Sequence, residues 1–382
     1  MTETVAGTGA VGTGPLSGIR VIEIGHILAG PYAGMLLADM GADVIKVESA
    51  GGDLSRQVGS LSVGPHNVYF ASLNRNKRSV RIDLTTEEGQ AQLGKLVADA
   101  HALLVNLRPQ VIRKLGLDYR SLRRHNEKIV CVALTGYGLD GPGAGRPSFD
   151  YVVQAETGVA AMAGVPGGVP ALAGYSVVDN SAGLAAALGL LAKLLEGKGG
   201  QVDVSLFDVM LSQLNYKAAS YLNGGGEPLS RPQGAHSFYV PAQLFDTGSG
   251  YIALFVTRDD LWRALCEEIG RPDWGDDPRF ATVHARFENR EQLLDGLAGE
   301  FAKAPASEWE ARLRPLGIPV GEVKGLADAL DSDLASSRGM VVSVDTTDGP
   351  IHLVGNPIHT DGPTARYLPP PLLGEQTEEL LA

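Results

Sequence analysis

The chain has 382 residues, of which 44% are hydrophobic and 20% are charged, and it carries a net charge of −12. This length predicts two domains, and the composition is that of an ordinary globular protein. The negative charge argues against nucleic acid or an anionic membrane as the main partner, whereas a small anionic ligand would respond to local charge instead.

Cys131 and Cys266 are far apart and form neither a disulfide framework nor a zinc pattern. This cysteine usage predicts a cytoplasmic protein without a metal site. No apolar run is expected to span a membrane, because Lys193 and Glu196 interrupt the longest one. Residues 1–14 lack the pattern of a signal peptide and are predicted to form a disordered extension.

After this extension, apolar strands alternate with helices. Helices are predicted over 31–40 and 87–100, and strands over 19–24, 43–47, 79–84, 102–107, 129–135 and 200–206. The alternation predicts an α/β fold with a doubly wound parallel sheet. Ligands of such sheets bind at the carboxyl ends of the strands. In this chain the strand ends carry His26, Glu48, Asp83, Asn106, Arg108 and Gly136–Gly138.

The stretch Gly174–Gly197 places Asp179 before a run made almost wholly of alanine, leucine and glycine. A helix that is apolar on all sides is expected to be buried. Asp179 then has two interpretations, which this stretch leaves open. It is either the N-cap of the helix or a carboxylate that faces a cavity and acts as a nucleophile.

The second half of the chain has a different pattern. Residues 223–234 are rich in glycine and proline and are predicted to be a linker, with Gly224–Gly226 as a candidate lid. Residues 235–330 are predicted to form a smaller α+β domain, with antiparallel strands over 242–245 and 251–256 and three helices. The large domain is assigned to 15–222 and a final linker and C-terminal segment to 331–382.

Common catalytic motifs are missing from the sequence. GHILAG follows the first strand but is not GxGxxG, so a nicotinamide-dependent oxidoreductase with Glu48 on the ribose is disfavoured. No GxSxG, HExxH or P-loop motif is present, which removes the usual hydrolase, protease and kinase interpretations. Two basic clusters are candidates for binding a phosphate-bearing ligand. They contain Lys77, Arg78, Arg108, Arg113 and Lys114.

Several motifs in order make the sequence resemble the class III CoA-transferases from about Leu16 to Leu380. That family includes formyl-CoA:oxalate, carnitine and succinyl-CoA-dependent transferases and the related α-methylacyl-CoA racemases. The resemblance rests on LSGIRVIEIGHILAGPYAGMLLADMGADVIKVE, NRNKRSVRIDL, NLRPQVIRKLGLDY, TGYGLDGP, FDYVVQAETG, VVDNSAG, GKGGQVDVSLFDVM, GIPVGEV and PLLGEQTEE.

The resemblance implies that Asp179 is a nucleophile that forms an aspartyl anhydride and then an aspartyl-CoA thioester. It further implies an interlocked homodimer, in which each chain has a Rossmann-like large domain, a small domain and a C-terminal segment that returns to the large domain. Coenzyme A would be a co-substrate and not a tightly bound cofactor, and the partners would be an acyl-CoA donor and a carboxylic acid acceptor. The implied CoA contacts are His26, Leu28, Ala29, Asp83, Leu84, Asn106, Leu107, Arg108 and Lys114.

Two positions depart from the family pattern. The racemases place a His–Asp pair where this chain has Phe149 and Asp150, which are candidate substrate-pocket residues. Phenylalanine cannot transfer a proton, so a transferase is favoured over a 2-methylacyl-CoA racemase or epimerase. Ser49 and Ala50 stand where some transferases carry arginines toward the nucleotide. A catalytically silent CoA-binding protein is a further alternative.

Overall fold

The structure, a computed structural model, describes residues 13–361 and 367–382 and divides them into two compact units. The described residues of the large unit lie within Met1–Thr157, Gly174–Ser220 and Asp333–Ala382. The small unit contains Gly158–Ala173 and Tyr221–Ser332. Residues 158–173, which the sequence analysis places in the large domain, therefore group with the small unit. Residues 1–12 of the predicted N-terminal extension lie outside the described residues.

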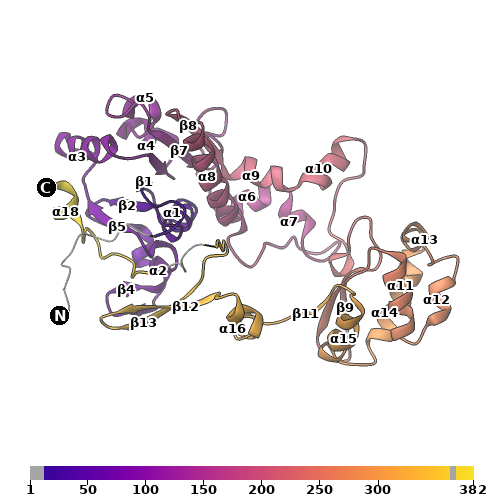
Figure 1. The fold of residues 1–382 in the computed structure, drawn as a ribbon. Helices are drawn as coiled ribbons and strands as arrows, with labels where there is room; N and C mark the ends of the chain where they lie inside the picture. The colour runs from indigo at the N-terminus through magenta and orange to yellow at the C-terminus, as the bar shows by residue number, and fades with distance from the viewer. Residues whose placement is uncertain (1–12, 362–366) are drawn as a thin grey trace. The chain divides into compact units, whose positions relative to one another are not determined.

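The large unit is built on a six-stranded sheet in which all neighbouring strands are parallel (Figure 1). The strand order is β5-β2-β1-β6-β7-β8, so the winding reverses between β1 and β6. This reversal confirms the predicted doubly wound sheet and marks its topological switch point. The strands are β1 (Arg20–Ile24), β2 (Asp43–Glu48), β5 (Arg78–Arg81), β6 (Ala102–Val105), β7 (Val130–Thr135) and β8 (Gly200–Ser205).

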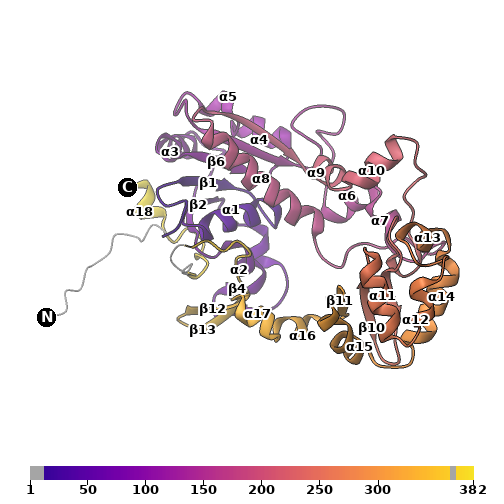
Figure 2. The same cartoon turned by 45° about the vertical axis from the view of Figure 1, so that its right-hand side comes forward.

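Helices cover both faces of this sheet (Figures 1 and 2). Every residue of β6 and β7 is buried, which is the expected result for parallel strands with helices on both sides. Two helices pack on one face, α1 (Ala29–Asp39) and α8 (Val177–Leu195). The core of the other face includes side chains from α3 (Glu87–Ala98), α4 (Pro109–Leu115) and α5 (Tyr119–Leu122).

The composition of helix α8 predicts burial on all sides, but one side of the helix is exposed. Leu188 is 69% exposed and Leu195 is 89% exposed. Its buried face packs closely on α1, because a Cβ atom at Gly183 would lie 2.8 Å from the Ala29 carbonyl oxygen. By length and composition alone α8 could cross a membrane despite Lys193, contrary to the sequence expectation. Its packing against α1, β7 and β8 instead makes it a core helix of this unit.

The remaining elements of the large unit surround the sheet. The end of the chain lies on this unit, because α18 packs against α3 and β5 and the hairpin of β12 and β13 packs against α2. The elements that surround the sheet are η1 (Leu54–Gln57), β3 (Ser62–Val63), β4 (His66–Asn67), α2 (Val68–Asn74), α6 (Asp150–Glu156), α9 (Leu206–Gln213), α17 (Asp333–Ser337), β12 (Val341–Thr346), β13 (Gly349–Val354) and α18 (Thr377–Leu381). Helix α10 (Asn215–Leu222) crosses the boundary between the units.

The small unit has the predicted α+β organisation. Its antiparallel sheet has the order β11-β10-β9, and its core centres on the fully buried Trp262 and on the ring pair of Phe245 and Phe301 at 4.9 Å. Its strands are β9 (Ala242–Asp246), β10 (Tyr251–Phe255) and β11 (Val320–Glu322). Its helices are α7 (Val159–Met162), η2 (Pro232–Gly234), α11 (Asp259–Glu268), α12 (Pro272–Asp276), α13 (Val283–Glu288), α14 (Arg290–Phe301), α15 (Ala306–Leu313), η3 (Arg314–Leu316) and α16 (Leu326–Leu330).

Candidate active site

A pocket of about 270 Å³ opens in the large unit at the carboxyl ends of β1, β6 and β7. This place is the topological switch point, where a doubly wound sheet binds its ligands. The pocket brings together many of the residues that the sequence analysis selects, from segments that are far apart in the chain. These residues are His26, Leu28, Ala29, Asn106, Leu107, Arg108, Phe149 and Asp179.

Asp179 is the acidic residue of the pocket lining. It lies in the first turn of α8, which begins at Val177, so Asp179 is inside the helix and the N-cap interpretation of its side chain is wrong. Within the described part of the chain, its carboxylate accepts no hydrogen bond and pairs with no basic side chain. Burial, with a smaller contribution from the nearby Asp150 carboxylate, raises the pKa of Asp179 to about 7.

Asp150 supplies the cap that Asp179 does not. Its Oδ2 accepts hydrogen bonds from the backbone N–H groups of Val178, at 2.7 Å, and Asp179, at 3.1 Å. Its Oδ1 accepts a bond of 2.5 Å from Gln154. Asp150 is only 5% exposed and does not line the pocket, whereas the neighbouring Phe149 lines it and is 69% exposed. Of the two candidate substrate-pocket residues, one therefore borders the pocket and the other orients α8.

The turn between β1 and α1 is held by Asn106, which follows β6. Asn106 accepts a hydrogen bond from the His26 N–H and donates one to the His26 carbonyl, both at 3.0 Å. The turn passes so close to this amide that a Cβ atom at Gly25 would lie 1.7 Å from the Asn106 Oδ1. Gly25 therefore permits close approach of two strand ends and does not act as part of a dinucleotide fingerprint.

The surroundings of His26 favour its neutral form. Burial lowers the pKa of His26 below its ordinary value, against the opposing effect of Asp53. The Leu54 N–H donates to Nδ1 at 3.4 Å, which favours the tautomer with the ring proton on Nε2. Because His26 lines the pocket, it brings a neutral hydrogen-bond donor to the site.

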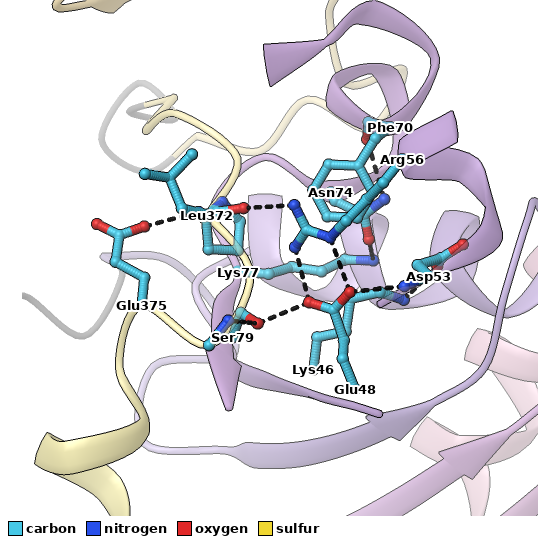
Figure 3. Close-up of polar contacts among 12 residues, drawn as sticks. Lys46, Glu48, Asp53, Arg56, Phe70, Asn74, Lys77, Ser79, Leu372 and Glu375 are labelled. Atoms are coloured by element: carbon cyan, nitrogen blue, oxygen red, sulfur yellow. Dashed lines mark hydrogen bonds and ion pairs between the residues drawn. The ribbon is translucent and has the colours of Figure 1, made fainter. Parts of the chain in front are cut away.

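A buried charge network contacts this turn through Asp53 and Lys46. Figure 3 labels its members Lys46, Glu48, Asp53, Arg56 and Lys77. The network consists of Glu23, Lys46, Glu48, Asp53, Arg56 and Lys77, all of them buried except the partly exposed Arg56. Glu48 is paired with Arg56 at 2.7 Å and accepts hydrogen bonds from the Ser79 hydroxyl at 2.6 Å and the Asp53 N–H at 2.8 Å. Since the Glu48 carboxylate is bound within the protein, it does not serve as the ribose-binding acid of a nicotinamide site.

Other predicted site residues lie outside the pocket. Asp83 is exposed, and its carboxylate accepts bonds from the Thr85 N–H and hydroxyl at 3.0 and 2.6 Å. Leu84 packs against the core below α3, and Lys114 is exposed on α4. The remaining cations of the two basic clusters do not converge with Arg108. Lys77 pairs with Glu23, Arg78 with Asp43 and Glu379, and Arg113 with Asp140.

The pocket also contains a basic residue that the sequence analysis does not select. Arg146, from the loop between β7 and α6, lines the pocket and pairs with Glu156. Glu156 accepts a bond of 2.7 Å from the Tyr137 hydroxyl, and the Arg146 guanidinium lies 4.5 Å from the centre of the Tyr137 ring. The available signal was a single arginine in a loop otherwise made of glycine, proline and alanine.

Among the residues that the structure describes, no three or more His, Cys, Asp or Glu side chains are grouped so that they could hold a metal ion.

Comparisons with known proteins place the chain among relatives of one family. The model of CoA-transferase family III matches residues 16–377. The chain is 35% identical to the succinate–glutarate CoA-transferase of Agrobacterium fabrum, over 96% of this chain and 95% of that protein. It is 33% identical to the acetyl-CoA:oxalate CoA-transferase of Acetobacter aceti, over 95% and 92%. Its structure is similar to the crystal structure of a CaiB/BaiF family protein from Brucella suis, with a TM-score of 0.83 and 32% identity over 96% and 98% of the two chains.

Proposed function

Since the chain belongs to CoA-transferase family III, we propose that it moves coenzyme A from an acyl-CoA donor to a carboxylic acid acceptor, with Asp179 as the nucleophile. The observation that carries this proposal is the Asp179 carboxylate itself, which borders the pocket without a partner among the described residues. A structural carboxylate would be paired, as those of the buried charge network are.

In the first half of the reaction, the Asp179 carboxylate attacks the donor thioester carbonyl. The C–S bond breaks, CoA leaves as a thiolate, and a mixed anhydride remains on Asp179. The thiolate then attacks the aspartyl carbonyl of the anhydride, which releases the donor acid as a carboxylate and leaves an aspartyl-CoA thioester. The acceptor carboxylate repeats these two steps in reverse and leaves as the new acyl-CoA. No electrons are transferred, and no net proton is taken up.

Three features of the pocket support this chemistry. A raised pKa makes the Asp179 carboxylate a stronger nucleophile than an ordinary aspartate and still leaves much of it ionised near neutral pH. Each attack produces an oxyanion, which backbone N–H donors can stabilise. The N–H of Ala29, in the first turn of α1, has no partner inside the helix, and Ala29 lines the same pocket. Arg108, at the start of α4, supplies a positive charge suited to CoA phosphate.

The identity of the acceptor is narrowed by the relatives. Those described above are named for glutarate and oxalate, which are both dicarboxylic acids. A dicarboxylic acceptor would present one carboxylate to the Asp179 carbonyl and a second to a cation, and Arg146 is a cation of this pocket. We therefore place dicarboxylic acids first among the acceptors to test. The interlocked homodimer and the cytoplasmic location remain predictions from the resemblance and the composition.

The racemase alternative is disfavoured by the same pocket. Two-base racemisation at C2 needs a second proton-transfer group opposite the first. Phe149, which stands at the position of the racemase histidine, lines the pocket with a side chain that carries no titratable proton.

A trapping experiment tests the proposal directly. The protein is incubated with acetyl-CoA or succinyl-CoA, reduced with borohydride and digested. The mass of the peptide that contains Asp179 is then measured by mass spectrometry. Reduction of an acylated Asp179 to the alcohol is the expected result, and it should be absent in Asp179→Asn. An unmodified Asp179 with deuterium exchange at C2 of a 2-methylacyl-CoA would establish the racemase instead. Binding of CoA without modification or exchange would establish the silent CoA-binding protein.

A further inference from the structure

The turn that enters α1 contains a residue in an unfavourable backbone conformation. Ile27 has a φ of 69°, and it is the β-branched member of the non-glycine residues with positive φ in the described part of the chain. An isoleucine in this region is strained, because its Cβ atom crowds the backbone. Ile27 and both of its neighbours, His26 and Leu28, line the pocket, so the strained residue sits where ligand contact is expected.

Asp53 contacts the backbone of Ile27. Its Oδ1 accepts a hydrogen bond of 3.1 Å from the Ile27 N–H, and the same oxygen accepts bonds from the N–H and the hydroxyl of Ser55, at 2.8 and 2.7 Å. Its Oδ2 is paired with the Lys46 ammonium at 2.8 Å. Both Asp53 and Lys46 are completely buried, so these bonds form in a medium of low dielectric constant, where they are strong.

Asp53 is itself bonded within the buried charge network, and Figure 3 shows its contact with Glu48. The Asp53 N–H donates to Glu48 at 2.8 Å, and Lys46 is also paired with Glu23 at 2.7 Å. Burial by itself would raise the pKa of Asp53, but Lys46 and the N–H donors hold it below its ordinary range. These contacts favour the ionised form of the Asp53 carboxylate.

We propose that Asp53 is a positioning residue of the coenzyme A site: its hydrogen bond to the Ile27 N–H keeps the turn from His26 to Leu28 in the strained conformation that the pocket requires. This inference rests on the proposed function, because it assigns the turn to CoA binding. Asp53 does not line the pocket and acts only through the turn. A purely structural ion pair with Lys46 would contribute to stability and leave ligand binding unchanged.

Loss of the hydrogen bond should appear as weaker binding of CoA. Without it, Ile27 relaxes to negative φ in most molecules, and the apparent affinity falls by the fraction that remains competent. We expect Asp53→Ala, which removes the acceptor of the Ile27 N–H, to raise the KM for acyl-CoA and the Kd for free CoA about tenfold, with kcat within about twofold, because saturating substrate selects the competent turn. Asp53→Glu keeps the charge opposite Lys46 but displaces the acceptor, and should have the same effect if Asp53→Ala folds poorly.

A rescue variant separates positioning from stability. Glycine adopts a φ near 69° without strain, so Asp53→Ala combined with Ile27→Gly should recover the Kd to within about threefold of the unaltered protein. The matched control is Asp39→Ala, which removes another buried carboxylate, one paired with Arg75 at 2.6 Å on the opposite end of α1 from the pocket. It should lower the melting temperature and leave the Kd for CoA unchanged.

The experiment is calorimetric titration of each purified variant with free CoA, followed by transferase kinetics. An unchanged Kd in a folded Asp53→Ala or Asp53→Glu variant would overturn the positioning role, as would a double variant that binds no better than the single one. Failure of the unaltered protein to bind CoA would instead overturn the proposed function. Binding without transfer would leave the positioning role testable by Kd alone, so the two failures are distinguishable.

Discussion

The side chain of Asp150 accepts a hydrogen bond of 3.1 Å from the backbone N–H of Asp179. One aspartate therefore caps the helix that presents the other to the pocket. The same proximity places a negative charge near the Asp179 carboxylate, which adds to the effect of burial and raises the pKa of Asp179. Orientation of the proposed nucleophile and adjustment of its basicity are thus two consequences of one contact.

The pH dependence of transfer follows from this pKa. Asp179 reacts as the carboxylate, so kcat/KM should increase with pH through a midpoint near 7 and become constant above it. Below the midpoint it should fall about tenfold per pH unit. Initial rates with saturating acceptor between pH 5 and 9 measure the profile, and circular dichroism at each pH checks that the protein stays folded. A constant kcat/KM between pH 5.5 and 8 would contradict an unpaired, buried nucleophile.

Replacement of Asp150 should displace that profile. In Asp150→Asn the amide oxygen still accepts the N–H groups of Val178 and Asp179, but the negative charge is gone. The midpoint of kcat/KM should therefore move to lower pH. Asp150→Ala also removes the cap and should cost about 1 kcal/mol of stability.

The control for the cap is Thr86→Ala, since Thr86 caps α3 by accepting the Gly89 N–H at 3.0 Å, outside the pocket. It should lower stability by a similar amount and leave the midpoint where it is. A midpoint that does not move in Asp150→Asn would show that Asp150 has no electrostatic influence on the reaction.

Asp179 should lower the stability of the protein at alkaline pH. Its folded-state pKa of about 7 lies above the ordinary 3.8, so the folded state binds the proton more tightly than the unfolded state. The contribution of this group to stability is then greatest at low pH, declines between these two values, and stays low above pH 7. Asp179→Asn should abolish transfer and be roughly 1–2 kcal/mol more stable than the unaltered protein at pH 8.

Urea unfolding at pH 8 and pH 4.5 measures this difference. The advantage of Asp179→Asn should be smaller at pH 4.5, where the Asp179 carboxyl of the folded protein is already neutral. An equal difference at both pH values would indicate a packing effect of the amide and not a cost of ionisation.

A methyl group at Gly25 should disturb the site through Asn106. In Gly25→Ala the Cβ atom would lie 1.7 Å from the Asn106 Oδ1, so the amide must move and its two bonds to His26 are lost. We expect a stability loss of about 1–3 kcal/mol and a higher KM for acyl-CoA. Gly299→Ala is the control, because nothing lies within 4 Å of the added atom in helix α14. It should be neutral or slightly stabilising and leave KM unchanged.

The local pattern of apolar and turn residues was sufficient to predict most strands of the large unit and its first helices. The strands and first helices were predicted within a few residues because each is a short apolar run bounded by turn residues, and their alternation implies a parallel sheet. A break between two consecutive helices depends on the local backbone: α9 ends at Gln213 and α10 begins at Asn215, where φ is 20°. The hairpin of β12 and β13 was missed, since its buried residues pack against α2 and not against neighbours in sequence.

The sequence by itself determined the sheet, the identity of the candidate nucleophile and the order of motifs that leads to the family, because these depend on residue type and on spacing along the chain. Only the tertiary structure decided what each side chain does. Asp150 and Asp179 are 29 residues apart, and Asn106 and His26 are 80 apart. Contacts between distant segments cap α8, fix the turn at His26 through Asn106 and pair Glu48 with Arg56 and Ser79. Such contacts form only when the sheet brings its strand ends together.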